Sequence, residues 1–188
     1  MCRSSLVMLA MLVFAARAAN ATTYAPATFT DLVTRADVIF AGEVIDVQPF
    51  AVDTRDGTII KTRVVFRVSD PLWGTTAALE VFEFLGGELN GSGMAVADMP
   101  TFAVGDRRVV FASRRRSINP IVGFRQGLLE IRRDSSGVDR IFTLDGLPLT
   151  QPENIGSAVR VSPQVEQPMR LADFRDRVLR ALSLVRKP

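Results

Sequence analysis

The stretch ADVIFAGEVIDVQPF, residues 36–50, decides the fold, because it predicts one long β-strand with apolar side chains on both faces. One face would carry Val38, Phe40 and Val44, and the other would carry Ile39, Ala41, Ile45 and Val47. Gly42 lies in the middle of this run, and a glycine inside a strand is typical of a bend or bulge. We therefore expect the strand to bend at Gly42 and to serve two sheets.

The segments that follow predict further strands. TIIKTRVVFRVSD, residues 58–70, alternates apolar and charged side chains, and the preceding DTRDG, residues 53–57, has the composition of a hairpin turn. DTRDG lacks the alternating oxygen ligands and the distal glutamate of a calcium loop. LEVFEFL, residues 79–85, predicts the third strand. The loop GGELNGSGMAVADMP, residues 86–100, is rich in glycine and is expected to be a flexible connection or a binding loop.

The second half predicts a strand over residues 107–113 and a hairpin over residues 127–144 that turns at 134–137. Residues 145–168 are rich in Pro, Gln, Asn and Ser, which predicts an extended connector. No repeat is evident, and the length suits one domain.

Two helices are predicted, one at each end of this array. In TFTDLV, residues 28–33, Thr28 is a candidate N-cap, and Asp31 is placed to complete a capping box. Near the C-terminus, apolar residues recur at helical spacing on one face; they are Leu171, Phe174, Val178, Leu182 and Val185. We expect this second helix to dock on the strands as part of the core. A membrane-surface role is the alternative, which Asp173 and Asp176 weaken.

The N-terminus has the pattern of a secretory signal peptide. Arg3 precedes the apolar run of residues 6–16, and the small residues ARAANA, residues 16–21, follow it. Cleavage near Ala21 would make Thr22 the new N-terminus, and a cut before Ala19 is the alternative. The apolar run is shorter than the about 20 residues that a membrane span needs. We therefore expect a secreted or periplasmic protein without a membrane span.

Charge and residue usage exclude several kinds of chemistry. Loss of Arg3 and Arg17 with the leader, without loss of Asp or Glu, would lower the net charge from +3 to +1. The chain has no histidine, and its single cysteine is Cys2, inside the leader. The usual zinc, copper, haem and iron–sulfur sites, and catalysis by Ser-His-Asp or Cys-His groups, need residues that are missing. We expect no metal, no cofactor, no catalytic residues and no enzyme activity.

Carboxylate chemistry is the remaining catalytic possibility. The pairs Glu80 with Glu83, and Asp53 with Asp56, are candidates for an acid and a base, but exposed strand and turn charges are the simpler interpretation. The three arginines of FAVGDRRVVFASRRR, residues 102–116, are interpreted as a solvated strand end, with an anion or acidic-protein contact as the alternative. Nucleic acid is not an expected partner of an exported protein with few exposed aromatic residues.

Residues 36–114 resemble the OB-like barrel of tissue inhibitors of metalloproteinases and netrin-like domains. The resemblance lies in the order of ADVIFAGEVIDV, TRVVFRVSDPLWG, LEVFEF and FAVGDRRVVFA. The residues that carry it are Phe40, Gly42, Val44, Phe66, Val68, Trp73, Gly74, Phe102, Gly105 and Phe111. The inhibitors use an N-terminal cysteine and disulfides that this chain lacks. It is more similar to the cysteine-free domains of uncharacterised exported bacterial proteins.

The resemblance implies a mainly β fold, with a small OB-like β-barrel, an added hairpin and a C-terminal amphipathic α-helix. The expected domain organisation is a signal peptide over 1–21, the barrel with its hairpin over 22–144, the connector over 145–168 and the helix over 169–188.

The resemblance also implies a function. We expect a non-enzymatic module that binds a protein partner, with a protease as one candidate. The free N-terminal segment and the glycine-rich loop would form the binding edge. The candidate binding residues are Thr22, Thr23, Tyr24, Gly86, Gly87, Gly91 and Gly93. The alternatives are an envelope enzyme that uses carboxylates and a glycan-binding module; the single Trp and single Tyr argue against the latter.

Overall fold

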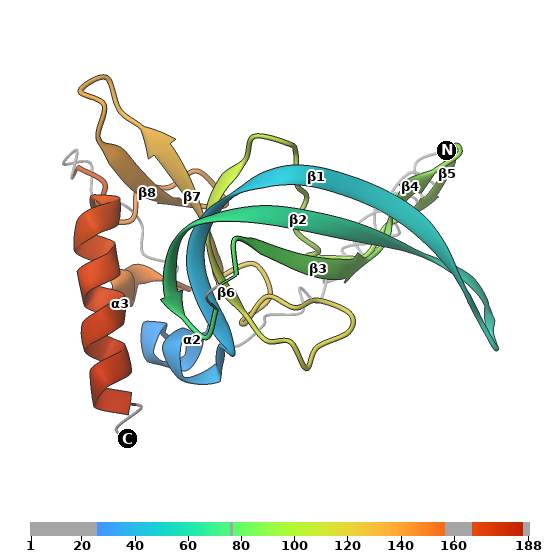
Figure 1. The fold of residues 1–188 in the computed structure, drawn as a ribbon, viewed down its shortest axis with the longest axis horizontal. Helices are drawn as coiled ribbons and strands as arrows, with labels where there is room; N and C mark the ends of the chain where they lie inside the picture. Colours follow the sequence, from blue (N-terminus) through green and yellow to red (C-terminus); the bar gives the residue numbers. More distant parts are fainter. Residues whose placement is uncertain (1–25, 76, 157–166, 186–188) are drawn as a thin grey trace, which may run out of the picture.

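The computed structural model describes residues 26–75, 77–156 and 167–185, and across these residues the fold is mainly antiparallel β-structure (Figure 1). Six strands form one sheet in the order β3-β2-β1-β6-β7-β8, and β4 and β5 form a separate small sheet. The elements are α2 (Phe29–Arg35), β1 (Val38–Thr54), β2 (Gly57–Trp73), β3 (Leu79–Leu85), β4 (Gly87–Leu89), β5 (Ser92–Met94), β6 (Arg107–Ala112), β7 (Leu128–Arg133), β8 (Asp139–Thr143), a short 3₁₀ helix (Pro152–Asn154) and α3 (Leu171–Val185). The predicted mainly β fold with a C-terminal helix is therefore confirmed.

The sheet has two ends, β3 and β8, and no pairing joins these two strands among the described residues. The segment that follows β6 approaches β3 at one point, where the Leu85 amide donates to the Ile118 carbonyl at 2.9 Å. Closure into an OB-like barrel therefore stays a prediction.

The long hairpin of β1 and β2 bends near its start. The pairing shifts register between Ile39 and Phe40, between Ala41 and Gly42, and between Val44 and Asp46. A Cβ at Gly42 would lie 2.7 Å from the Arg67 carbonyl oxygen and 3.2 Å from the Phe40 ring, so only glycine fits there. The predicted bend is confirmed, but β1 stays in one sheet and serves two hydrophobic cores instead of two sheets.

The two cores lie on opposite faces of the sheet. The helix-side core contains Ile39, Ala41, Val109, Phe111, Leu129, Ile141, Phe174, Val178 and Leu182, among others. The phenylalanine core contains Val38, Phe40, Val44, Val64, Phe66, Phe82, Phe84, Val110, Ala112, Ile121 and Leu128. Within the second core, Phe66 makes edge contacts with Phe40 and Phe82, at ring-centroid distances of 5.7 and 6.2 Å.

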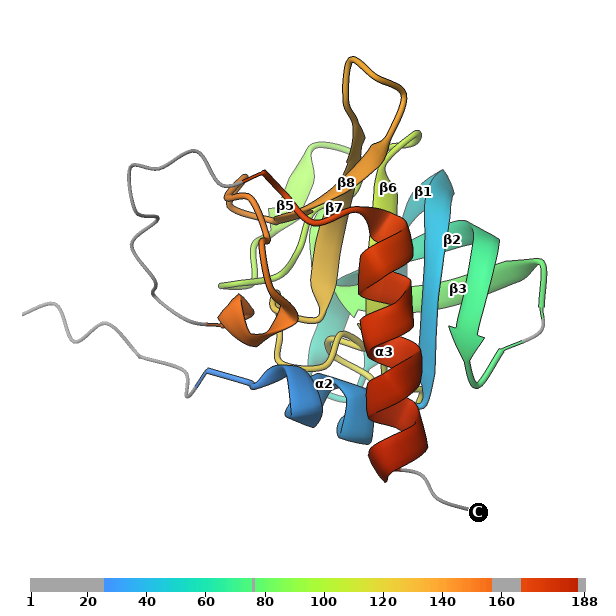
Figure 2. The same ribbon diagram turned by 90° about the vertical axis from the view of Figure 1, so that its left-hand side faces the viewer.

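Both helices cover the helix-side core (Figure 2). Helix α2 begins at a capping box, because the Asp31 amide donates to Thr28 Oγ1 and the Thr28 amide donates to Asp31 Oδ2, as the sequence predicts. The Phe174 ring of α3 contacts the rings of Phe29 and Phe111, at centroid distances of 6.0 and 6.3 Å. Helix α3 thus joins α2 to the sheet. No helix of the described residues is long and apolar enough to cross a membrane.

The first part of the predicted connector also packs on the helix-side core. Leu149 and Ile155 are buried there, on either side of the 3₁₀ helix. Residues 157–166 of the connector and the predicted signal peptide, 1–21, lie outside the described residues.

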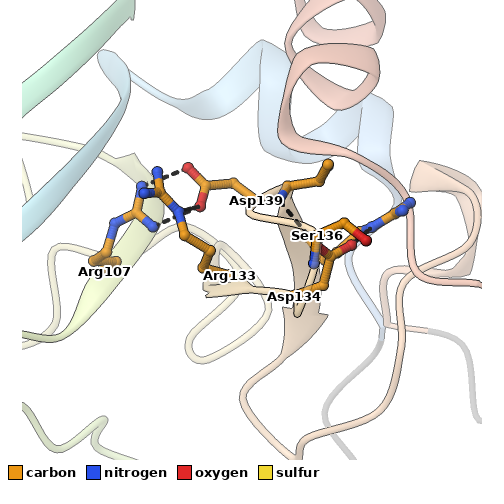
Figure 3. A network of polar contacts seen from close by, with 7 residues as sticks. Arg107, Arg133, Asp134, Ser136 and Asp139 are labelled. Atoms are coloured by element: carbon orange, nitrogen blue, oxygen red, sulfur yellow. Dashed lines mark hydrogen bonds and ion pairs between the residues drawn. The ribbon is translucent and has the colours of Figure 1, made fainter.

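An ion-pair network attaches the β7–β8 hairpin to β6 (Figure 3). Asp139 on β8 accepts two hydrogen bonds from Arg107 on β6, both at 2.7 Å, and a third from Arg133 at 3.1 Å. The Arg107 guanidinium holds the pKa of the Asp139 carboxyl well below its usual range. In the predicted turn, Asp134 accepts from the amides of Ser136 and Val138 and from Arg140 Nε.

The bend at Gly42 predicts a large effect of added side-chain volume. Gly42→Val should lower the free energy of unfolding by about 1–3 kcal/mol, because the new atoms meet backbone that cannot move freely. Gly93→Val is the matched control, because nothing lies within 4 Å of a Cβ at Gly93. Urea unfolding of both variants measures the difference, and equal stabilities would contradict the close approach at Gly42.

The Asp139 network predicts a dependence of stability on pH. Asp139→Asn should lower the free energy of unfolding at pH 7 by about 1.5–3 kcal/mol, because hydrogen bonds to a charged acceptor are lost. The lowered pKa stabilises the folded chain fully above the unfolded carboxyl's ordinary value of 3.8. This stabilisation decreases progressively as the pH falls below that value towards the lower pKa of the folded state. Urea unfolding of both proteins from pH 7 to pH 3 should show the gap narrowing; a constant gap would contradict this origin.

Candidate functional site

The glycine-rich loop contains a tight hairpin, which the sequence analysis did not predict. Strands β4 and β5 pair from Gly87 with Met94 to Leu89 with Ser92. Asn90 and Gly91 form the turn, with φ angles of 52° and 78°. Two successive residues with positive φ are typical of a type I′ turn, for which Asn-Gly is the favoured pair. The dipeptide was therefore a signal for this hairpin in the sequence.

The hairpin folds back over the sheet at Gly86 and Gly87. The Gly86 amide donates to the Ile60 carbonyl, and Thr62 Oγ1 donates to the Gly86 carbonyl, both at 2.7 Å. Gly87 has a φ of 135°, and a Cβ there would overlap Thr62 Oγ1. Gly86 and Gly87 are therefore positioning residues for the loop. Gly91 and Gly93 lie in the open, with nothing within 4 Å of a Cβ at either position.

A half-open groove of about 410 Å³ lies between this loop and the sheet. Most of its lining is apolar. Its walls are Val47, Pro49, Phe84, Leu85, Met94, Ala95, Val96, Met99, Pro100 and Phe102, with Thr62, Gly86, Gly87, Glu88 and Thr101 beside them. Phe102 packs against Phe84 and Phe66, at ring-centroid distances of 4.7 and 5.7 Å, so the floor of the groove is continuous with the phenylalanine core. We refer to this site as the loop groove.

A second hollow, of about 450 Å³, is lined in part by Asp98 of the same loop. It is lined by Ala27, Arg35, Asp98, Arg116, Gly123, Phe124, Arg125, Gln126 and Asp145, and we refer to it as the arginine hollow. Asp98 follows Val96 of the loop groove by two residues. Arg125 is paired with Asp145 at 3.1 Å. Three arginines face two carboxylates in this lining, so the hollow has a surplus of positive charge.

The predicted N-terminal binding residues Thr22, Thr23 and Tyr24 lie outside the described residues. The described residues begin at residue 26. The Ala27 amide donates to Gln126 Oε1 at 2.6 Å. Ala27 follows the predicted N-terminal binding segment, and Asp98 belongs to the glycine-rich loop. Both residues line the arginine hollow, so both parts of the predicted binding edge lead to this hollow.

Glu80 and Glu83 do not form a paired carboxylate site, and Asp53 and Asp56 are both exposed at the β1–β2 turn, as expected. Glu80 is buried, contrary to the expected exposed position, and Glu80 Oε1 accepts from Arg114 at 2.6 Å. Glu83, on the opposite face of β3, is paired with Lys61 at 3.5 Å and Arg63 at 3.3 Å. Among the described residues, no three His, Cys, Asp or Glu side chains are grouped closely enough to hold a metal ion.

The arginine run is not simply a solvated strand end. Besides pairing with Glu80, Arg114 donates to the Gly74 carbonyl at 3.2 Å, and its own amide donates to Asp37 at 3.0 Å. Arg116 donates to the Ile121 carbonyl and lines the arginine hollow. Only the middle residue, Arg115, fits the original interpretation. The prediction of a solvated strand end was wrong because the folded sheet places β3 near the end of β6. The pattern of residues within each strand gives no information on such a contact.

No model of a known protein family matches this chain, and no curated protein matches it in sequence. The resemblance to metalloproteinase inhibitors and netrin-like domains therefore stays a prediction from the order of the strands.

The groove residues that the sequence analysis did not select are the apolar ones. Met94, Val96 and Met99 lie in the glycine-rich loop, in which only glycines were predicted as binding residues. Their signal was the presence of large apolar side chains in a segment too irregular to be a buried strand.

The contact between Arg114 and Glu80 predicts unequal effects within the arginine run. Arg114→Ala should lower the free energy of unfolding by about 1–3 kcal/mol, because it leaves a buried carboxylate unpaired. Arg115→Ala, the adjacent control, should change it by less than about 0.5 kcal/mol. The double variant Glu80→Gln with Arg114→Ala should be less destabilised than the sum of the single variants. Equal effects of Arg114→Ala and Arg115→Ala in urea unfolding would contradict the ion pair.

Proposed function

We propose that this protein is an exported, non-enzymatic binding module that holds a segment of a partner protein in the loop groove and the arginine hollow. The observation that carries the proposal is the loop groove itself, an apolar hollow of about 410 Å³ open to solvent. An exposed apolar hollow with few polar groups is typical of a binding site. The expected ligand has an apolar side chain for the groove.

The construction of the groove supports this proposal. Its floor is fixed, because Phe84 and Phe102 pack into the phenylalanine core. Its outer wall includes Met94 and Met99, whose unbranched side chains adapt to different ligand shapes. A rigid floor with an adaptable wall is suited to holding a protein side chain, and loops on a rigid scaffold are the usual place for such sites.

The arginine hollow adds a preference for charge. Arg35, Arg116 and Arg125 line it, against Asp98 and Asp145. Because guanidinium groups bind carboxylates in paired hydrogen bonds, a partner segment with an acidic residue beside its apolar residue would contact both hollows. The same loop lines both hollows, through Val96 and Met99 in the groove and Asp98 in the arginine hollow.

The OB-like barrel and the protease partner belong to the same proposal. The order of the strands and the contact of Leu85 with Ile118 support a barrel-like closure. If the partner is a protease, Thr22, Thr23 and Tyr24 would extend the binding edge from Ala27. Without a disulfide to hold this segment, ordering it costs about 1–2 kcal/mol per residue, so inhibition would be weak.

The carboxylate enzyme is the weaker candidate. Glu88 lines the loop groove, whereas Glu83 does not line it and is already paired with Lys61 and Arg63.

The proposal predicts that a charge in the groove abolishes binding while the fold stays intact. The immobilised chain should capture a partner from a native envelope fraction, and Met94→Glu should reduce the affinity for that partner at least about tenfold. Thermal unfolding of the variant should be nearly unchanged, because Met94 is half-buried on the loop. Isothermal titration with the captured partner measures the affinity.

Two controls make this experiment specific. Val104→Glu introduces the same charge at an exposed valine outside the groove and should bind normally. Arg35→Glu should weaken binding, whereas Arg55→Glu, in the exposed β1–β2 turn, should not. Capture that is equally strong with Met94→Glu and Val104→Glu would overturn the groove as the site.

A further inference from the structure

Strand β3 forms one end of the six-stranded sheet, and among the described residues no further strand pairs with its outer edge. Two apolar side chains on this strand are exposed, Leu79 at 49% and Val81 at 51%. Both helices pack on the helix-side core, and none of the described residues of that core belongs to β3. Phe84 and Leu85, at the end of β3, line the loop groove, whereas Leu79, Val81 and Glu83 do not.

The hydrogen bonds around β3 show which backbone groups point outward. The Val68 amide donates to the Ala78 carbonyl at 2.9 Å, and the Gly86 amide donates to the Ile60 carbonyl at 2.7 Å. Bonded and non-bonded pairs alternate along an antiparallel ladder, so the even-numbered residues of β3 face β2. The odd-numbered residues Leu79, Val81, Glu83 and Leu85 therefore point their amides and carbonyls away from β2. At Leu85 the outward amide binds Ile118.

The open groups are thus those of Leu79, Val81 and Glu83, which are spaced symmetrically about Val81. We propose that two copies of this chain pair their β3 strands antiparallel, about a two-fold axis at Val81. In this register Val81 meets Val81 of the second copy, and Leu79 meets Glu83 of the second copy. In this register the outward amides of Leu79, Val81 and Glu83 in both copies, six in all, each donate to an outward carbonyl of the other copy. No outward backbone group of these residues is then left without a hydrogen bond.

The side chains on the outer face of the sheet fit the same axis. Val65 on β2 is paired with Val81, so the dimer would place four valines in one row across the axis. Arg67 is paired with Leu79 and Arg63 with Glu83, so the neighbouring row would run Arg67, Leu79, Glu83 and Arg63, with the last two from the second copy. The apolar centre and the two flanking rows, each with a leucine and a glutamate between two arginines, repeat about the axis, as a two-fold interface requires.

The length of the shared ladder limits the strength of this contact. Pairing begins at Leu79, where β3 begins, and ends before Leu85, where the Ile118 segment occupies the edge. An interface of one short strand from each copy is small, so the dimer should be weak and should depend on concentration.

Charge substitution at the axis tests the proposal directly. The purified chain should show a monomer–dimer equilibrium in sedimentation experiments at rising concentration. Val81→Lys and Val81→Glu should each be monomeric across the same range, because like charges meet at the axis. An equimolar mixture of the two variants should form a heterodimer. Val104→Lys, at an exposed valine away from β3, is the matched control and should dimerise like the unchanged chain.

Amide hydrogen exchange gives a second readout that does not depend on a variant. Exchange at Leu79, Val81 and Glu83 should slow as the concentration rises, whereas exchange at Glu80, Phe82 and Phe84, which are bonded to β2, should not change. A chain that stays monomeric at every concentration would overturn the proposal. Dimerisation retained by Val81→Lys would overturn it too. A chain that never self-associates but binds a strand of another protein at this edge would also overturn it.

Discussion

The fold depends on one strand that carries two cores. Residues of β1 alternate between the helix-side core, through Ile39 and Ala41, and the phenylalanine core, through Val38, Phe40 and Val44. The close approach of the Arg67 carbonyl to Gly42 lets the β1–β2 hairpin bend at this point without leaving the sheet. Because both cores share the same backbone, neither can loosen without disturbing the other.

This arrangement explains where binding can occur. The helices cover one end of the sheet, and β1, β2 and β3 extend beyond them and carry the β4–β5 hairpin (Figure 1). The loop groove lies on the part of the sheet that the helices do not cover. Phe84 and Phe102 form its floor and pack in the phenylalanine core. The proposed binding site therefore lies away from the helix-side core but shares Phe84 and Phe102 with the phenylalanine core.

The sequence predicted most helices and strands correctly but not the contacts between them. The capping box of Thr28, the bend at Gly42 and the turn at 134–137 are local patterns, and each was found where the residues indicated. The pairing of Glu80 with Arg114 joins residues 34 positions apart, and it depends on how the sheet curves. The loop groove was missed for the same reason, since its walls come from three separate segments. The β4–β5 hairpin did have a local signal, the Asn90–Gly91 pair, and the apolar side chains of the glycine-rich loop were another.

Native-state hydrogen exchange in increasing urea tests the shared strand most directly. The account predicts that buried amides of β1 in both cores, and those of α3, exchange with one free energy, equal to that of global unfolding. Amides of the loop over residues 95–102 should exchange through local opening at a lower free energy, as an adaptable wall requires. Release of α3 and the β7–β8 hairpin at a lower urea concentration than β1, as an independent unit, would contradict the claim that one strand holds both cores together.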